Sequence, residues 1–222
     1  MKIGKRSWAS PGIMGMVLLA LSVQPVWLDS RSWAEEKIAV VAPEIKVPEG
    51  TPDALTAILT RRSIRDYTPH PVPEELIKLL LEAGQAAASA FGERSTEFVV
   101  VNDKKILEEI SKVIPASLQL KKATVAIVVC GNQGKEKFKG QGYWQLDGAA
   151  ASENIFIAAH ALGLGAVWTA IYPYQDRIPR LQKILNLPEE VIPLNVIPVG
   201  YPAEKKTREN LYDASRVHNN KW

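Results

Sequence analysis

The chain has 222 residues, 46% hydrophobic and 23% charged, which is ordinary for a globular protein with one well-filled domain. The formal net charge is +3, and the first 34 residues hold four basic side chains against one acidic one, so residues 35–222 carry 23 of each sign. This neutral remainder excludes the broad basic field of a nucleic-acid-binding domain.

Residues 1–34 have the pattern of a targeting segment. A basic start precedes the run "GIMGMVLLALSVQPVW", whose 16 residues fall short of the roughly 20 that a transmembrane helix needs. Ser32 and Ala34 suit cleavage before Glu35. We therefore expect a cleaved signal peptide and an exported, periplasmic protein without a stable membrane span after processing. A membrane-anchored protein is the alternative.

Residues 35–52 are predicted to form a lead-in arm, and residues 53–222 the folded domain. A first helix is expected over about 53–62, with Thr51 as its N-cap. Further along the chain, the periodicity predicts helices over 72–89, 104–114, 145–165 and 177–187, and buried strands over 97–103, 123–131, 166–173 and 191–202. This uneven alternation favours an α+β fold in which a mixed sheet is packed between helices.

Three residues of these strands carry more specific expectations. Pro193 and Pro198 place the last strand near an edge of the sheet or make it irregular. Cys130 is the only cysteine, so no intrachain disulfide can form, and it is expected to be a buried strand residue. The three histidines lack metal-ligand spacing, and no metal site is predicted.

The segment "RRSIRDY", residues 61–67, concentrates positive charge in an otherwise neutral domain. Arg61 and Arg62 come at the end of the first predicted helix, where cations contribute about 0.3–1 kcal/mol by interaction with the helix dipole. A bound anion is the other explanation. These residues alone leave both explanations open.

The order of four segments resembles the FMN-dependent nitroreductase family: "RRSIRDY", "AAASAFGERSTEFVVVND", "AAHALGLGAVW" and "VIPVGYPAEKKTREN". The similarity extends from about residue 54 to 222. It implies a nitroreductase-like α+β fold that forms an intertwined homodimer. It also implies that FMN lies at the dimer interface in contact with both chains, and that each terminal segment reaches over the partner.

The resemblance assigns the basic residues to the cofactor. It implies that Arg61, Arg62 and Ser63 contact the phosphate and ribityl chain of FMN, with Lys206 and Arg208 as a second basic pair. A guanidinium donates several charge-assisted hydrogen bonds in a planar fork, which suits a phosphate dianion.

Other site residues follow from the same resemblance. Arg65 is implied at the flavin pyrimidine edge, where a cation stabilises the reduced flavin; a surface ion pair with Asp66 or a glutamate is the alternative. Ser89 is implied at the start of the second cofactor segment. That segment departs from the family pattern, because Gly92 replaces a flavin-contacting Asn. Arg94 either substitutes for that Asn or faces solvent.

The strand end "WTAIYP" falls where the family lines the isoalloxazine ring. The backbone N–H groups of Thr169 and Ala170 are implied near flavin N5 and O4, while Trp168 is expected to pack in the core.

The family resemblance implies a flavin oxidoreductase. Electrons pass from a donor such as NAD(P)H through flavin N5 to nitroaromatic, quinone or flavin acceptors in a ping-pong mechanism, and no catalytic side chain is named. NAD(P)H is scarce outside the cytoplasm, which conflicts with export. Alternatives are a dehalogenase, an azoline dehydrogenase or a flavin-fragmenting enzyme of the same family, a non-catalytic exported flavin electron-transfer protein, or a protein without flavin.

Overall fold

The computed structural model describes residues 47–115, 117–207 and 209–222. The predicted signal peptide, most of the lead-in arm and Arg208 therefore lie outside the described residues. The helices are α2 (Ala54–Thr60), α3 (Glu74–Gln85), α4 (Lys104–Val113), α5 (Leu118–Lys122), α6 (Tyr143–Ala161) and α7 (Arg177–Leu185), with 3-10 turns η1 (Ala90–Gly92), η2 (Gln133–Lys135) and η3 (Ala214–Arg216). The strands are β1 (Thr96–Val101), β2 (Val125–Asn132), β3 (Gly165–Ala166), β4 (Thr169–Ala170) and β5 (Val191–Gly200).

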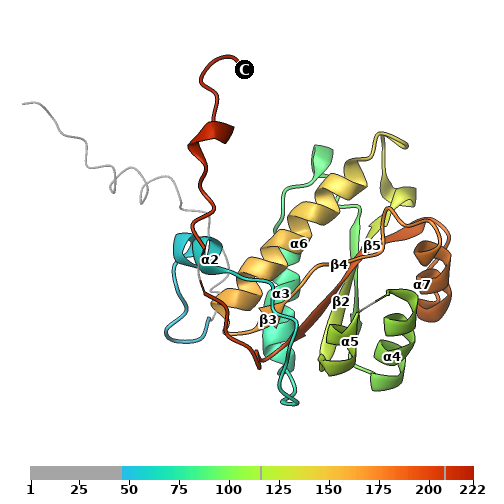
Figure 1. Ribbon diagram of the computed structural model, residues 1–222. Helices are drawn as coiled ribbons and strands as arrows, with labels where there is room; N and C mark the ends of the chain where they lie inside the picture. Colours follow the sequence, from blue (N-terminus) through green and yellow to red (C-terminus); the bar gives the residue numbers. More distant parts are fainter. Residues whose placement is uncertain (1–46, 116, 208) are drawn as a thin grey trace, which may run out of the picture. The chain divides into compact units, whose positions relative to one another are not determined.

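The strands form one antiparallel sheet in the order β1-β2-β5-β3, with β4 also paired to β5. Helices cover both faces of this sheet (Figure 1). Successive residues of a strand point to opposite faces, so β2 contributes Ala126, Val128 and Cys130 to one core and Ile127 and Val129 to the other. The predicted α+β fold, with its sheet packed between helices, is confirmed, but the strand pairs of the described residues are all antiparallel, so the sheet is not the mixed one expected.

The two cores have different helices. On one face, α4, α5 and α7 pack with Leu107, Leu120 and Leu181 fully or almost fully buried. On the other face, α3 and α6 contribute Leu80 and Ile155, neither of which has any exposed surface. Cys130 is buried, as predicted. The α3–α6 layer also carries the side chains that matter for the site.

Strand β5 differs from its prediction in one respect. It lies between β2 and the pair β3/β4, so the predicted edge position is wrong. The predicted irregularity is confirmed, because the register with β2 shifts beside Pro193. β3 ends at Ala166 and β4 begins at Thr169, and Pro198 of β5 lies opposite the gap between them. Proline has no N–H to donate, so the predicted strand 166–173 is divided into two short strands.

The start of α2 also differs from prediction. Asp53, rather than Thr51, is the N-cap, and its carboxylate accepts a hydrogen bond of 3.0 Å from the backbone N–H of Thr56. The helix ends at Thr60, and Arg61 is the C-cap, whose N–H donates to the carbonyl of Ala57. The arginine segment therefore begins where α2 ends.

Close packing fixes the path of that segment against β3. The N–H of Ile64 donates to the carbonyl of Ala166 at 3.0 Å, and Ser63 forms a parallel bridge with Ala166. A Cβ at Gly165 would lie 2.6 Å from Ile64 Cγ2, so only glycine lets the two backbones come this close. The segment thus leaves α2 and continues along the sheet.

Candidate functional site

Arg61 is half-buried against α6. Its Nε lies 3.1 Å from a carboxylate oxygen of Glu153, and its guanidinium lies over the ring of Phe156, 5.7 Å from the centroid. The side chain keeps 27% of its surface exposed. Arg61 is therefore oriented by neighbours on both sides but still has N–H groups available to a ligand.

Arg62 is used differently. Its Nε donates to the carbonyl of Thr207 at 3.1 Å, its Nη2 to the carbonyl of Glu209 at 3.1 Å, and its Nη1 to the carbonyl of Arg61 at 2.8 Å. Three of the five N–H donors of this guanidinium therefore bond to backbone carbonyls. In this arrangement Arg62 ties the C-terminal segment to the end of α2.

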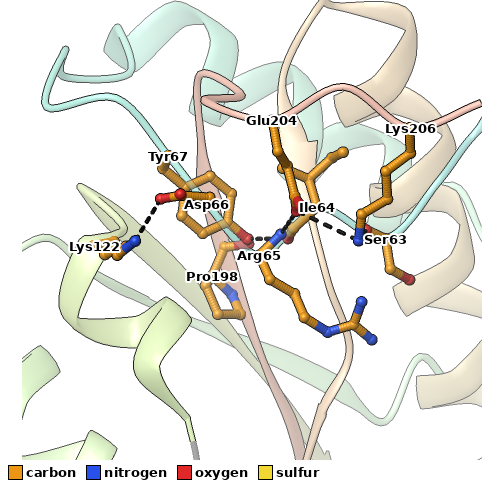
Figure 2. Close-up of polar contacts among 9 residues, drawn as sticks. All are labelled: Ser63, Ile64, Arg65, Asp66, Tyr67, Lys122, Pro198, Glu204 and Lys206. Atoms are coloured by element: carbon orange, nitrogen blue, oxygen red, sulfur yellow. Dashed lines mark hydrogen bonds and ion pairs between the residues drawn. The ribbon is translucent and has the colours of Figure 1, made fainter.

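Residues 63–68 run antiparallel to residues 201–206. The backbone bonds are those of Thr68 N–H to the Tyr201 carbonyl, 2.8 Å, and Ala203 N–H to the Asp66 carbonyl, 2.9 Å. Two bonds that involve side chains continue this pairing, as Figure 2 shows. The N–H of Arg65 donates to the Glu204 carboxylate at 2.6 Å, and the Lys206 ammonium donates to the Ser63 carbonyl at 2.8 Å. Segments more than 130 residues apart in the sequence therefore form one polar unit.

Among the described residues, the Arg65 side chain forms no ion pair with Asp66 or with a glutamate, which contradicts that alternative. Asp66 instead accepts a hydrogen bond of 2.8 Å from Lys122, on the other side of the segment (Figure 2). This bond holds the pKa of Asp66 below its usual value. The Arg65 side chain is exposed.

A pocket of about 300 Å³, which we call the arginine pocket, lies beside these residues. It is lined by Ile58 and Leu59 of α2, by Arg61–Ser63, and by residues 209–212 of the C-terminal segment. It therefore combines cationic and hydroxyl donors with apolar side chains and one acidic residue, Glu209. This donor set fits a phosphate, and the apolar wall suits the less polar part of a ligand.

A second pocket, the α3–α6 pocket, has a volume of about 360 Å³ and is lined by Ser89, Arg94, Asp147 and parts of α3 and β1. Asp147 is buried and accepts a hydrogen bond of 2.9 Å from the N–H of Ala90. Ser89 Oγ accepts a bond of 3.2 Å from the N–H of Arg94. Two hydrogen bonds therefore hold the turn between Ser89 and Arg94: one to Asp147 of α6 and one within the turn itself.

This turn has an uncommon backbone. Phe91 and Arg94 have φ values of 53° and 49°, in the left-handed region that non-glycine residues rarely adopt. Such conformations persist only where the surroundings enforce them, and they cluster at ligand sites. Arg94 lines the α3–α6 pocket and its side chain is exposed, so both alternatives for Arg94 stay open.

Thr169 and Ala170 form β4 and line neither pocket. Thr169 Oγ1 accepts a bond of 3.3 Å from Gln119, and the Ala170 carbonyl accepts one of 2.8 Å from Arg177. Trp168 was expected in the core, yet 39% of its surface is exposed. It lies next to the split between β3 and β4, where the sheet leaves it uncovered.

His160 lies beside the arginines at the end of α6. Its Nε2 is 2.8 Å from Thr60 Oγ1, and that hydroxyl donates its own hydrogen to the Thr56 carbonyl, so the histidine nitrogen must be the donor. Burial, and then the charges of Arg61 and Arg62, lower the pKa of His160 below its ordinary value.

The structure thus brings Arg61, Arg62, Ser63 and Lys206 together and places Ser89 and Arg94 in a separate pocket. Sequence reasoning missed three positions: Glu153, Glu204 and Asp147. Only Asp147 had a visible signal, as a lone acid in the alanine-rich stretch "QLDGAAAS". The other two act through partners distant in sequence.

The sequence model of the Nitroreductase family matches residues 58–142 and 119–201. A relative from Methanothermobacter thermautotrophicus, provisionally named a NADH dehydrogenase/NAD(P)H nitroreductase, is 48% identical over 170 residues, which are 77% of this chain and 88% of that protein. A crystal structure of a protein with the same provisional name from Parabacteroides distasonis is similar with a TM-score of 0.72 and 46% identity, covering 76% of this chain and 98% of that one. The structure of an FMN-dependent nitroreductase from Clostridium difficile is similar with a TM-score of 0.70 and 29% identity, covering 76% of this chain and 99% of that one.

These relatives also correct the predicted location. The archaeal relative is named for NADH and NAD(P)H, which are donors of the cytoplasm. The prediction of an exported, periplasmic protein is therefore wrong. The anchored alternative depends on residues 1–34, which lie outside the described part of the chain. None of the helices in the described ranges is long and apolar enough to cross a bilayer.

The architecture, the arginine pocket and the comparisons agree with one another. The match of the family model covers well over half of the chain, and the archaeal relative is matched over most of its own length. The chain belongs to the Nitroreductase family and is an FMN-dependent oxidoreductase.

Proposed function

We propose that the protein takes electrons from NAD(P)H onto FMN and passes them to nitroaromatic, quinone or flavin acceptors, with donor and acceptor using the flavin in turn. The observation that carries this proposal is the arginine pocket. There, Arg61 is oriented by Glu153 and Phe156, stays partly exposed, and lines the same pocket as Ser63 and several apolar side chains. The names of the relatives support the choice of donor and acceptor class.

In this proposal the basic residues have two tasks. Arg61 and Ser63 bind the FMN phosphate directly. Arg62 holds the C-terminal segment through its bonds to Thr207 and Glu209, and Lys206 holds Ser63 through its carbonyl. Arg208, which lies outside the described residues, is proposed as a phosphate ligand from the family resemblance alone.

We further propose that two copies of the chain complete the flavin site. Leu55, Ile58 and Leu59 of α2 expose half or more of their surface, and so do Leu211 and Tyr212 of the C-terminal segment. Apolar side chains gathered in this way are typical of an interface. The arginine pocket of one copy would then face the α3–α6 pocket of its partner, so that Ser89 and Arg94 reach the same flavin.

The chemistry itself belongs to the cofactor: FMN, when bound, accepts and releases a hydride at N5. The chain orients the flavin through its phosphate. β4, with Thr169 and Ala170, is proposed as the backbone that approaches the ring. No side chain is assigned as a catalytic acid or base.

Steady-state kinetics test this function. NADH or NADPH oxidation should depend on an added nitroarene, quinone or free flavin. Plots of reciprocal rate against reciprocal donor concentration should be parallel at different acceptor concentrations, because donor and acceptor never occupy the site together. Intersecting lines would contradict the alternation, and an absence of turnover with every acceptor would contradict the proposed activity.

A further inference from the structure

Glu204 lies where the pairing of residues 63–68 with 201–206 changes from backbone bonds to side-chain bonds. Its Oε1 accepts a hydrogen bond of 2.6 Å from the N–H of Arg65 and lies 3.4 Å from the Lys206 ammonium. Lys206 in turn donates to the carbonyl of Ser63 at 2.8 Å. One carboxylate oxygen therefore connects both ends of the segment Ser63–Arg65, as Figure 2 shows.

The N–H of Ile64, between the two bonds, donates to β3 and not to the C-terminal side. Glu204 and Lys206 therefore make the contacts of Ser63 and Arg65 with the C-terminal side, between the bonds of Arg62 on one flank and the Asp66–Ala203 bond on the other. The hydrogen bond from Arg65 and the charge of Lys206 hold the pKa of Glu204 below its usual value, which shows that the charged form is favoured.

We infer that Glu204 is a positioning residue for the cofactor phosphate: it fixes Ser63 and Lys206 at the spacing that the phosphate requires. This inference rests on the proposed role of Arg61 and Ser63. Glu204 does not touch the ligand in this account. It acts through the backbone of Arg65 and through the ammonium of Lys206.

A carboxylate near the phosphate dianion also repels it. Positioning by Glu204 would strengthen FMN binding, whereas repulsion would weaken it. Glu204→Ala removes both the charge and the acceptor. Glu204→Gln removes the charge but keeps an oxygen that can accept from the Arg65 N–H. If position dominates, the alanine variant loses affinity and the glutamine variant recovers most of it. If repulsion dominates, both variants bind FMN more tightly than the wild type.

The measurement compares FMN with riboflavin, which lacks the phosphate. Dissociation constants of both flavins are measured by fluorescence on the full-length protein after flavin removal, for the wild type and both variants. Asp66→Asn is the matched control, because Asp66 is a lysine-paired carboxylate on the same segment that faces away from Lys206 (Figure 2). Thermal unfolding of each variant is recorded in parallel.

For Glu204→Ala we expect FMN binding to weaken about tenfold, the change expected for one hydrogen bond to a charged group, while riboflavin binding stays nearly unchanged. Glu204→Gln and Asp66→Asn should keep most of the preference for FMN. An equal loss for both flavins, or an unchanged preference in Glu204→Ala, would overturn the inference. If Glu204→Ala does not fold, Glu204→Gln decides. A folded Glu204→Gln variant that no longer binds FMN more tightly than riboflavin would overturn the inference, and one that keeps this preference would support it. A wild type that does not prefer FMN to riboflavin would instead overturn the proposed phosphate site, and this inference with it.

Discussion

Replacing Arg61 by alanine should weaken FMN binding roughly 10- to 150-fold, which corresponds to the loss of about 1.5–3 kcal/mol from a charge-assisted hydrogen bond. The structure shows why this effect should exceed the loss of stability. The Arg61–Glu153 pair is partly exposed, with 53% of the Glu153 side chain in solvent, and such pairs contribute about 0–1 kcal/mol to folding. The affinity is measured by fluorescence titration, and the stability by urea unfolding without flavin.

Arg180→Ala is the control for this experiment. Arg180 lies on α7 and donates a bond of 3.0 Å to the carbonyl of Lys112, so the same side chain is removed from a distant, exposed position. This variant should bind FMN like the wild type. Unchanged FMN affinity in Arg61→Ala together with lower stability would show that Arg61 only caps α2 and packs on α6.

The second large effect concerns the proposed dimer. We expect a dimer at micromolar concentration and expect Leu55→Glu to dissociate it, because a charge would be buried without a partner; Leu55 lies on α2 but does not line the arginine pocket. A central interface position typically contributes about 2–4 kcal/mol, so the dimer dissociation constant should rise roughly 30- to 1,000-fold. FMN should be lost at the same protein concentrations, since the site draws on both copies. Light scattering and flavin retention are measured together.

Leu118→Glu provides the matched change. Leu118 is 66% exposed on α5, against 70% for Leu55 on α2, and α5 lies on the opposite face of the sheet. This variant should remain dimeric and keep its flavin. A wild-type protein that is monomeric while it holds FMN would contradict the proposed dimer.

The elements with strong periodicity could be predicted from the sequence. The strands predicted over 97–103 and 123–131 are β1 and β2 with shifts of one or two residues, because both are short apolar runs between clear boundaries. The helix predicted over 145–165 is α6. The division of strand 166–173 could not be predicted, since its cause is Pro198, a residue of another strand that lies opposite the gap.

The site shows the same limit. The cluster Arg61–Ser63 is visible as a local excess of charge, so its importance could be predicted. The different tasks of its members could not. Arg62 bonds to residues 207 and 209, and Glu204 bonds to Arg65, across more than 130 residues of sequence. These contacts depend on the antiparallel pairing of two segments that have no strand-like periodicity.

The central claim is that this chain uses FMN to take electrons from a nicotinamide donor and pass them on. An anaerobic titration of the purified full-length protein, reconstituted with FMN, tests it most directly. NADH or NADPH should abolish the visible absorbance of the bound oxidised flavin. A nitroarene or quinone added after the donor is consumed should restore that absorbance. A protein that retains no FMN after reconstitution, or whose bound flavin stays oxidised with both donors, would contradict the account.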